Sequence, residues 1–353
     1  MHLYIRTDAN GKIGAGHIMR CIALAQAWQY QGGEVTFISC CENDPIRERI
    51  TQEGFSFVSI VRPHPHSSDL TQTLNIIESK RPNDPSSVWL VLDGYHFTPE
   101  YQKAIRDTGN YLLVIDDMNH LPQYHANILL NQNIHAPDLN YHCDEDTALL
   151  LGTRYVLLRR EFLKYRGFKR QIPDQAKNIL VTLGGADPDN VTLKVIEALK
   201  LLDYPEIEVK IIIGPANPHQ NLLSQTLFSS FSAFELLINP PDMPELMAWA
   251  DLAISAAGST CWELAFMQLP FVAIVAAENQ CQSAQKLANR LVTVFNVADN
   301  MFIKNIVHSL KSLLNNKIIR EKLSGSIQNL IDGAGVNRTM QACNGNRGYA
   351  NGL

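Results

Sequence analysis

Long basic runs, long apolar runs and paired cysteines are all missing from this sequence. Lysine and arginine number 30 and aspartate and glutamate 35 among 353 residues, a formal net charge of −5. Without a basic cluster, binding to nucleic acid or to an anionic membrane surface is not expected. Apolar stretches such as residues 271–277 are far shorter than the roughly 20 residues of a membrane-spanning helix. Membrane insertion is therefore not expected either.

The cysteine and histidine patterns exclude further classes of site. The seven cysteines include the adjacent Cys40 and Cys41 but no Cys-x-x-Cys spacing. Charged residues at positions 6, 8 and 12 interrupt the apolar segment that a secretory signal needs. We therefore expect free thiols in a reducing cytoplasm. The histidines at 64, 66, 120, 125, 135 and 142 lie in polar, loop-like sequence, so we expect them at the surface and expect no metal and no cofactor.

Short β-branched runs alternate with helical spacing along the chain. Hydrophobic residues make up 46% of the sequence, and its 353 residues favour two domains with well-filled cores. Such short apolar runs fit strands buried on both faces of a parallel sheet. We therefore predict two doubly wound, Rossmann-like α/β domains with ligands in the cleft at the carboxyl ends of the strands. The strands are expected at 3–5, 35–39, 57–61, 88–92, 112–115, 128–130, 179–182, 209–213, 236–238, 252–255 and 271–275.

Domain boundaries follow from composition. Arginine and lysine are dense between residues 155 and 175, which marks a boundary between an N-terminal domain at 1–165 and a C-terminal domain at 170–340. The remaining residues, 341–353, are polar and glycine-rich, and we expect this tail to be frayed.

A glycine-rich loop with a histidine follows the first expected strand. Gly14 and Gly16 let the backbone approach a ligand, and His17 stands at the start of the next helix. The first amides of a helix suit a phosphate, and an imidazole there can act as a general base or acid. A tight turn with a capping histidine explains the same residues.

The second half contains two comparable loops. Gly184 and Gly185 would bring bare amides toward an anion, while Asp189 or Asn190 caps the next helix, although a plain turn fits as well. Gly258, Ser259 and Thr260 end a strand and open a helix, offering amides and hydroxyls to a diphosphate.

Three further polar residues accompany these loops. Glu263 can accept hydrogen bonds from ribose hydroxyls, or it can form a capping box with Ser259 or Thr260. Asn279 and Gln280 follow a buried strand and suit sugar hydroxyls and N-acyl groups, with capping of the following helix as the alternative.

These motifs, in this order, resemble those of one enzyme family. They are Gly14-x-Gly16-His17-x-x-Arg20, Leu183-Gly184-Gly185-Ala186-Asp187-Pro188, Gly258-Ser259-Thr260-x-x-Glu263 and Glu278-Asn279-Gln280. The chain is similar, over nearly its whole length, to the PseG family, the UDP-2,4-diacetamido-2,4,6-trideoxy-β-L-altropyranose hydrolases of pseudaminic acid biosynthesis. The resemblance implies a MurG-like GT-B fold in which the C-terminal domain holds most of the UDP.

The resemblance also implies a reaction and roles for residues. Water attacks C1 of a UDP-activated diacetamido sugar with inversion, and UDP leaves without a metal. His17 matches the family's general base, and Tyr95 resembles a residue that meets sugar or water, with ordinary aromatic packing as the alternative. Arg20 either touches the distal phosphate, orients a loop or is a solvated helix residue. Asp116 and Asp117 resemble the family pattern, and we interpret them as structural because adjacent side chains point to different faces.

Other activities and two remaining segments stay open at this point. A GT-B glycosyltransferase would pass the sugar from a UDP-sugar donor to an acceptor, and a hydrolysing UDP-sugar 2-epimerase would need a base for the C2 proton. A non-catalytic nucleotide-sugar binder would have no need of His17. The polar stretch 64–85 exceeds what the family needs and is expected to form loops, and Gly333-x-Gly335-x-x-Arg338 is expected to serve packing.

Overall fold

The computed structural model describes residues 1–11, 13–79, 88–202, 204–228 and 233–350, with 227–228 and 346–350 described by their backbone alone. Two compact units divide the chain. The first comprises Met1–Ile13, His17–Arg160 and Gly333–Leu353, and the second comprises Gly14–Gly16 and Glu161–Asp332. The chain thus returns to the first unit at Gly333, a segment that we expected to close the second domain.

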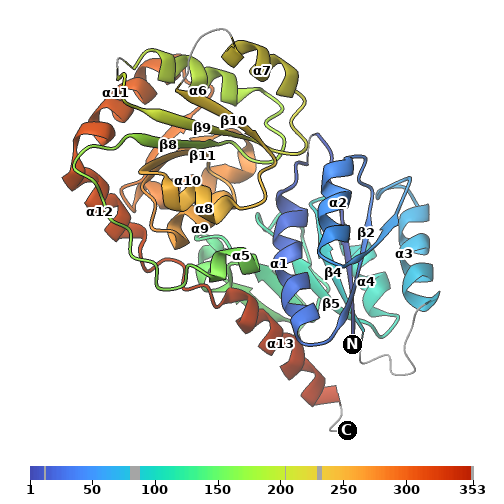
Figure 1. The fold of residues 1–353 in the computed structure, drawn as a ribbon. Coiled ribbons are helices and arrows are strands. Elements are labelled where there is room, and N and C mark those ends of the chain that lie inside the picture. The colour runs from blue at the N-terminus through green and yellow to red at the C-terminus, as the bar shows by residue number, and fades with distance from the viewer. Residues whose placement is uncertain (12, 80–87, 203, 229–232, 351–353) are drawn as a thin grey trace. The chain divides into compact units, whose positions relative to one another are not determined.

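The first unit is built on one seven-stranded parallel sheet flanked by helices (Figure 1). Its strands are β1 (His2–Thr7), β2 (Glu34–Ser39), β3 (Ser56–Ser59), β4 (Val88–Asp93), β5 (Tyr111–Ile115), β6 (Ile128–Asn131) and β7 (Ala148–Leu151). Its helices are α1 (Gly16–Tyr30), α2 (Asp44–Gln52), α3 (Ser68–Ser79), α4 (Pro99–Arg106), η2 (Ala136–Asp138), η3 (Thr153–Tyr155) and α13 (Gly335–Ala350). The strand order in the sheet is β3-β2-β1-β4-β5-β6-β7.

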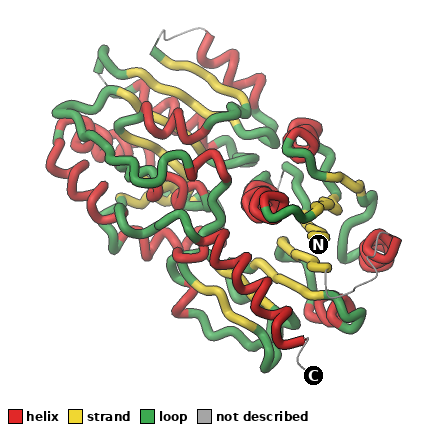
Figure 2. The backbone as a smooth tube through the Cα atoms, turned by 60° about the horizontal axis from the view of Figure 1, so that its bottom comes forward, coloured by secondary structure: helices red, strands yellow, loops and turns green. Residues whose placement is uncertain are grey.

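The second unit repeats this architecture around a six-stranded parallel sheet, as the alternation of helix and strand in Figure 2 shows. Its strands are β8 (Asn178–Thr182), β9 (Glu208–Ile213), β10 (Phe234–Ile238), β11 (Leu252–Ala256), β12 (Phe271–Val275) and β13 (Thr293–Asn296), in the order β10-β9-β8-β11-β12-β13. Its helices are α6 (Val191–Lys200), α7 (Gln220–Phe228), α8 (Met243–Trp249), α9 (Thr260–Phe266), η4 (Glu278–Gln280), α10 (Cys281–Ala288), α11 (Phe302–Asn315) and α12 (Lys317–Ile327), and α5 (Arg160–Leu163) precedes them.

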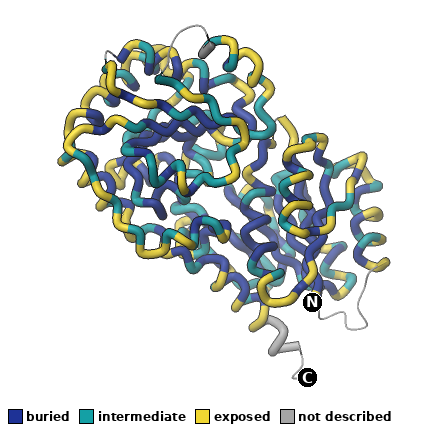
Figure 3. Tube along the Cα trace, viewed as in Figure 1, coloured by how far each residue is buried: buried dark blue, intermediate teal, exposed yellow. Residues whose placement is uncertain are grey.

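The central strands of both sheets are buried on both faces. All residues of β1, β4 and β11 are buried, and Figure 3 shows buried residues running along the sheets. Ile5 of β1 pairs with Phe37 on one side and Val91 on the other. Apolar side chains on both faces require helices on both faces, which is the doubly wound α/β class. The predicted fold class is therefore confirmed. Among the described residues, no helix is both long enough and apolar enough to cross a membrane.

Each sheet has one point at which the strand order reverses. In the first unit the chain builds β1, β2 and β3 outward and then crosses to β4 on the other side of β1. In the second unit the same reversal occurs between β8 and β11. The loops that leave adjacent strands at such a point diverge, which opens a crevice for ligands at the carboxyl ends. His17 follows β1 and Asp93 ends β4, so both belong to the reversal point of the first sheet.

Four sequence predictions about elements were incomplete or wrong. β7 and β13 were not predicted, because β7 is a leucine run without β-branched residues and β13 is a short, half-exposed edge strand. Within the stretch 64–85, residues Ser68–Ser79 form α3 rather than a loop, and residues 80–87 lie outside the described part. The tail predicted to fray is helical up to Ala350, because Val336, Met340 and Cys343 are spaced to bury one face of α13.

Packing explains the glycine motif at the start of α13. A Cβ on Gly335 would lie 2.3 Å from the backbone oxygen of Val156, so only glycine allows this approach. Arg338 donates from Nη1 to the backbone oxygen of Arg154 at 2.8 Å. Both contacts fix α13 to the segment around η3, the packing role that we expected for this motif.

A matched pair of glycines tests the close packing of the second unit. A Cβ on Gly214, just after β9, would lie 2.5 Å from the backbone oxygen of Gly184, whereas a Cβ on Gly325 in α12 meets open space. Gly214→Ala should lower the free energy of unfolding by about 1–3 kcal/mol. Gly325→Ala should raise it by about 0.5–1 kcal/mol, as expected inside a helix. Urea denaturation followed by tryptophan fluorescence measures both, and equal effects of the two substitutions would contradict the described approach of the loops.

Candidate functional site

A histidine and an aspartate pair at the reversal point of the first sheet. Nδ1 of His17, in the first turn of α1, lies 2.6 Å from Oδ1 of Asp93, the last residue of β4, and both side chains are buried. The hydrogen bond to the Asp93 carboxylate requires the proton on Nδ1, and Nη2 of Arg20 lies 3.1 Å from the same nitrogen. Nε2 of His17 has no hydrogen-bond partner in the part of the chain that the structure describes. Its lone pair is therefore available to accept a proton, and the pair has the parts of a general base with an orienting carboxylate.

Arg20 holds the aspartate of this pair in place. Its Nε donates to Asp93 Oδ2 at 2.6 Å, its Nη2 donates to Asp93 Oδ1 at 2.6 Å, and its Nη1 donates to Asp117 Oδ1 at 2.8 Å. The arginine side chain is buried, so the alternative of a solvated helix residue is wrong. All three nitrogens of the guanidinium serve two carboxylates, which favours the orienting role over contact with a distal phosphate.

The charge of Arg20 lowers the pKa of both carboxylates in this group. Burial alone would raise the pKa of Asp93, but the charge of Arg20, followed by that of His17, and their hydrogen bonds lower it below its ordinary value. Burial alone would also raise the pKa of Asp117, and there too the charge and the hydrogen bond of Arg20 lower it. Two ionised carboxylates and one guanidinium leave a net negative charge beside the imidazole.

Tyr95 extends the network toward the ring of His17. Its hydroxyl donates to Oδ2 of Asp117 at 2.7 Å, and its ring meets that of His17 edge-on at 5.0 Å between centroids. A phenol that donates its proton to a carboxylate orients itself and does not act as a base. Tyr95 therefore lies beside His17 and is fixed by Asp117, while contact with sugar or water stays a prediction.

The two adjacent aspartates serve separate networks. Asp116 accepts hydrogen bonds from the hydroxyls of Tyr124 and Tyr141 at 3.1 and 2.7 Å, and from two backbone amides, which agrees with a structural interpretation. Asp117 faces Arg20 and also receives a hydrogen bond from Asn133 at 2.6 Å. Sequence reasoning missed Asp117 as a site residue and gave no role to Asp93. An acidic residue at or just after the end of a fully apolar strand is the signal that marks both.

One predicted surface histidine is part of this network. His135 is 3% exposed, and its Nε2 donates to the backbone oxygen of Asp117 at 3.0 Å. The prediction that it lies at the surface is therefore wrong. The turn η2 (Ala136–Asp138) directly follows His135, so the sequence around this histidine has the composition of an exposed loop. Among the described residues, no group of three or more histidine, cysteine or acidic side chains is placed to hold a metal ion.

In the second unit, the first glycine loop follows β8. Gly184 has a φ of 89°, a conformation that favours glycine, and Gly185 follows it. The cap of α6 differs from the prediction. Both oxygens of Asp187 accept hydrogen bonds from the amides of Val191 and Thr192 at 2.8 and 2.9 Å, whereas Asn190 makes no capping hydrogen bond with its side chain. Asp187 caps the helix because its own left-handed backbone points the carboxylate back at α6.

The second loop follows β11, next to β8 in the sheet. A Cβ added to Gly258 would contact the amide nitrogen of Gln280 at 3.9 Å. Ser259 is the N-cap of α9 but makes no capping hydrogen bond with its side chain, so a capping box built on Ser259 is wrong. Thr260 begins α9, and Glu263 is half-buried one turn later.

The residues after β12 approach the same loop. Asn279 and Gln280 lie in η4, and Oε1 of Gln280 accepts a hydrogen bond from the amide of Ala276 at 2.9 Å. Gln280 makes no capping hydrogen bond to α10, so the capping alternative is wrong for Gln280. Because Oε1 is held, the donor nitrogen of Gln280 faces Gly258. Within this unit, one predicted residue after β12 thus lies beside the loop after β11.

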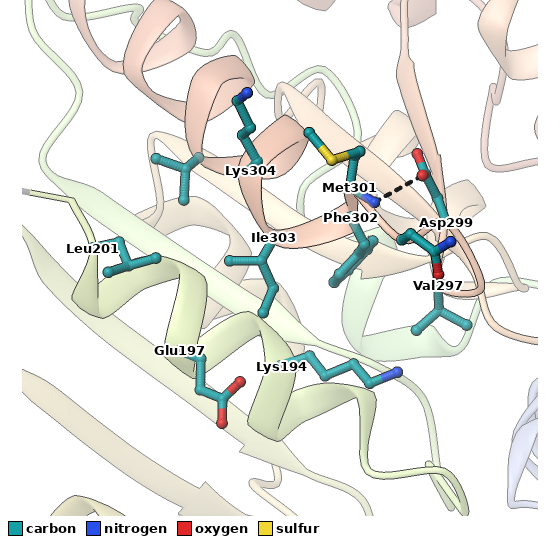
Figure 4. A pocket seen from close by; sticks show the side chains of 11 residues that line it. Lys194, Glu197, Leu201, Val297, Asp299, Met301, Phe302, Ile303 and Lys304 are labelled. Atoms are coloured by element: carbon teal, nitrogen blue, oxygen red, sulfur yellow. Dashed lines mark hydrogen bonds between the residues drawn. The ribbon is translucent and has the colours of Figure 1, made fainter.

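A hollow elsewhere in the second unit has no link to these residues. It has a volume of about 570 Å³ and lies between α6 and the start of α11, lined by Lys194, Glu197, Met301, Phe302 and Ile303 among others (Figure 4). None of the predicted site residues lines it. Its lining combines apolar side chains with the charged Lys194 and Glu197 and contains none of the glycine-rich loops.

The sequence is similar to those of several known proteins. Residues 178–329 match the Glycosyltransferase family 28 C-terminal domain. Uncharacterized protein MJ1062 of Methanocaldococcus jannaschii is 28% identical over 288 residues, which span 79% of this chain and 57% of that protein. The UDP-2,4-diacetamido-2,4,6-trideoxy-beta-L-altropyranose hydrolase of Campylobacter jejuni is 25% identical over 82% of this chain and 97% of its own length. The spore coat polysaccharide biosynthesis protein SpsG of Bacillus subtilis is 23% identical over 96% of both chains.

Solved structures agree on the fold. The UDP complex of MnaA from S. aureus superposes with a TM-score of 0.68 at 13% identity, covering 100% of this chain and 98% of that chain. MurG from Acinetobacter baumannii gives a TM-score of 0.62 at 16% identity, covering 97% and 99%. The fold is of the GT-B type, and residues 178–329 of the second unit are similar to the glycosyltransferase family 28 C-terminal domain.

Removing the arginine tests the charge network. Arg20→Met keeps the unbranched apolar stem of the side chain but leaves the buried Asp93 and Asp117 without their cation. We expect the free energy of unfolding to fall by about 3–5 kcal/mol. Arg47→Met, which removes an exposed pair with Asp44, should cost about 0–1 kcal/mol. Thermal unfolding of both variants measures this, and a similarly small loss in Arg20→Met would show that the buried pairs are not what holds the two carboxylates.

Proposed function

We propose that this protein hydrolyses a UDP-linked diacetamido-trideoxyhexose at C1, releasing UDP and the free sugar with inversion, in pseudaminic acid biosynthesis. The observation that carries the proposal is the His17–Asp93 pair, held by Arg20 at the reversal point of the first sheet. The similarity to the Campylobacter jejuni hydrolase over 97% of its length supports the same reaction. The family 28 match supports a nucleotide-sugar as the substrate class.

In the proposed step, His17 acts on water. Nε2 accepts a proton from a water molecule, whose oxygen forms a bond to the anomeric carbon while the C1–O bond to the diphosphate breaks. The bonding electrons leave with UDP, and the proton stays on the imidazolium that Asp93 and Asp117 stabilise. Attack opposite to the leaving group inverts C1. A diphosphate is a good leaving group, so this step needs one base and no general acid.

The proposed UDP ligands are the loop residues of the second unit. Gly258, Ser259 and Thr260 offer amides and hydroxyls to the diphosphate, and Glu263 offers a carboxylate to the ribose hydroxyls. Gly184 and Gly185 offer further amides after the neighbouring strand. Asn279 and Gln280 are assigned to N-acyl or hydroxyl groups of the sugar, because the amide nitrogen of Gln280 faces Gly258. Gly14 and Gly16 are assigned to the backbone approach that brings His17 to the substrate, and Tyr95 of the first unit is assigned to the water or the sugar.

A GT-B glycosyltransferase is the second candidate, favoured by the family 28 match. The two candidates differ in the molecule that attacks C1. Purified protein is incubated with UDP-2,4-diacetamido-2,4,6-trideoxy-β-L-altropyranose in H₂¹⁸O, and the products are followed by NMR and mass spectrometry. A hydrolase releases free sugar with ¹⁸O at C1, first as the inverted anomer, and leaves UDP unlabelled. UDP release that requires an added acceptor would establish a transferase instead, and a C2 epimer would establish an epimerase.

Removal of the proposed base should affect turnover and not binding. His17→Ala should retain affinity for UDP within a few-fold and lose on the order of 10²–10⁴-fold in kcat. His308→Ala, at an exposed position of α11, serves as the matched control and should leave both unchanged. Calorimetric titration with UDP and initial rates measure the two quantities. Near-normal turnover in His17→Ala would remove His17 from this role.

The partner of the base makes a separate prediction. Asp93→Asn places an amide beside Nδ1, and an amide nitrogen there favours the tautomer that carries its proton on Nε2, where it blocks proton acceptance. We expect kcat to fall on the order of 10²–10⁴-fold with KM nearly unchanged. Asp107→Asn, which alters an exposed pair with Lys103, is the control. A rise in KM with normal kcat would mean that Asp93 serves binding rather than the base.

A further inference from the structure

A second histidine of the first unit is engaged at both ring nitrogens. Nδ1 of His120 lies 3.2 Å from Oδ1 of Asp116, and Nε2 lies 3.0 Å from the backbone oxygen of Tyr95. Both partners are acceptors that carry no proton to donate. A neutral imidazole has one protonated nitrogen, so one of its two contacts would place lone pair against lone pair. Only the doubly protonated imidazolium satisfies both contacts.

The surroundings of His120 are arranged for a positive charge. Asp116 accepts hydrogen bonds from two tyrosine hydroxyls and two backbone amides in addition to its contact with the imidazole. Burial and the charge of Asp116 raise the pKa values of Tyr124 and Tyr141, so both remain neutral donors. The carboxylates that act on His120 are Asp116 and the more distant Asp117. The backbone oxygen and the ring of Tyr95 also contact it. The hydrogen bond to Asp116 raises the pKa of His120, and this outweighs its partial burial.

The ring of Tyr95 lies between two imidazoles. It meets His120 edge-on at 5.9 Å and His17 edge-on at 5.0 Å between centroids. Its hydroxyl is fixed by Asp117 and its backbone oxygen by His120, so the residue is held at both ends. Movement of the Tyr95 backbone would carry the ring away from His17, because the two rings share an edge contact.

We propose that His120, as an imidazolium, is a positioning residue that clamps the backbone oxygen of Tyr95 to Asp116 and so fixes the Tyr95 ring beside His17. The clamp itself is a property of this unit, while its effect on turnover rests on the proposed function. The sign follows from the protonation state: the clamp is complete below the pKa of His120 and is lost as the pH rises through it. Turnover should then decline on the alkaline side for a reason separate from His17.

The charge state is tested without any substrate. The full-length protein is labelled with ¹⁵N-histidine, and the ring nitrogens are followed by NMR from pH 5 to 9, with signals assigned through His120→Gln and His308→Gln. We expect both nitrogens of His120 to stay protonated to a higher pH than those of the exposed His308. A His120 that titrates with or below His308, or that is a neutral tautomer throughout, would overturn the proposal.

The effect on turnover is tested by keeping or removing the charge. His120→Gln can donate to Tyr95 but carries no charge for Asp116, and it should lower kcat on the order of 10-fold to 10²-fold, leave KM within a few-fold, and abolish the alkaline decline. His120→Arg keeps the charge at all pH values and should restore much of kcat while extending activity to higher pH. A His120→Gln variant with the pH profile of the unaltered protein would overturn the positioning role. If no hydrolysis is found at all, the proposed function fails, and the NMR titration still decides whether the clamp exists.

Discussion

The buried guanidinium of Arg20 is the interaction on which the arrangement around β1 and β4 depends. It binds Asp93 at both oxygens and Asp117 at one, so a residue of α1 ties together the ends of two neighbouring strands, β4 and β5. Without that cation, two buried carboxylates would face each other and the imidazole across an apolar sheet end, at a cost of several kcal/mol. The cation therefore offsets the free-energy cost of keeping an ionised aspartate buried next to His17. Stability and proposed chemistry depend on the same group.

The sequence was sufficient to predict the fold class and most strands, because buried parallel strands produce short apolar runs that alternate with helical spacing. It failed where the local pattern does not report tertiary packing. β7 lacks β-branched residues, and α13 looked like a frayed tail because its buried face is made of only a few spaced side chains in a polar, glycine-rich segment. Such elements are fixed by what they pack against, and sequence windows do not contain their partners.

The residues of the candidate site also divide into those that the local sequence identified and those that it did not. Residues in glycine-rich motifs, such as Gly14, His17 and Gly258, could be singled out because the loop chemistry is local. The roles of Asp93, Asp117 and His135 in the buried network could not be predicted. Their partners lie 73, 97 and 18 positions away in the chain and meet them only when the sheet forms. The cap of α6 shows the limit at short range: Asp187, not a residue nearer the helix, caps it because of a left-handed backbone turn that composition does not specify.

The return of the chain to its first unit has a consequence for biosynthesis. Apart from Gly14–Gly16, the second unit is one continuous stretch, Glu161–Asp332, whereas the first unit takes its last helix from Gly333–Leu353. Met340 and Cys343 of α13 are 1% exposed, so the first unit has an open apolar face until α13 has been made. The first unit is thus completed only after the whole of the second unit has left the ribosome. A chain cut before Gly333 would contain every residue of the second unit, while its first unit would still expose the surface that α13 covers.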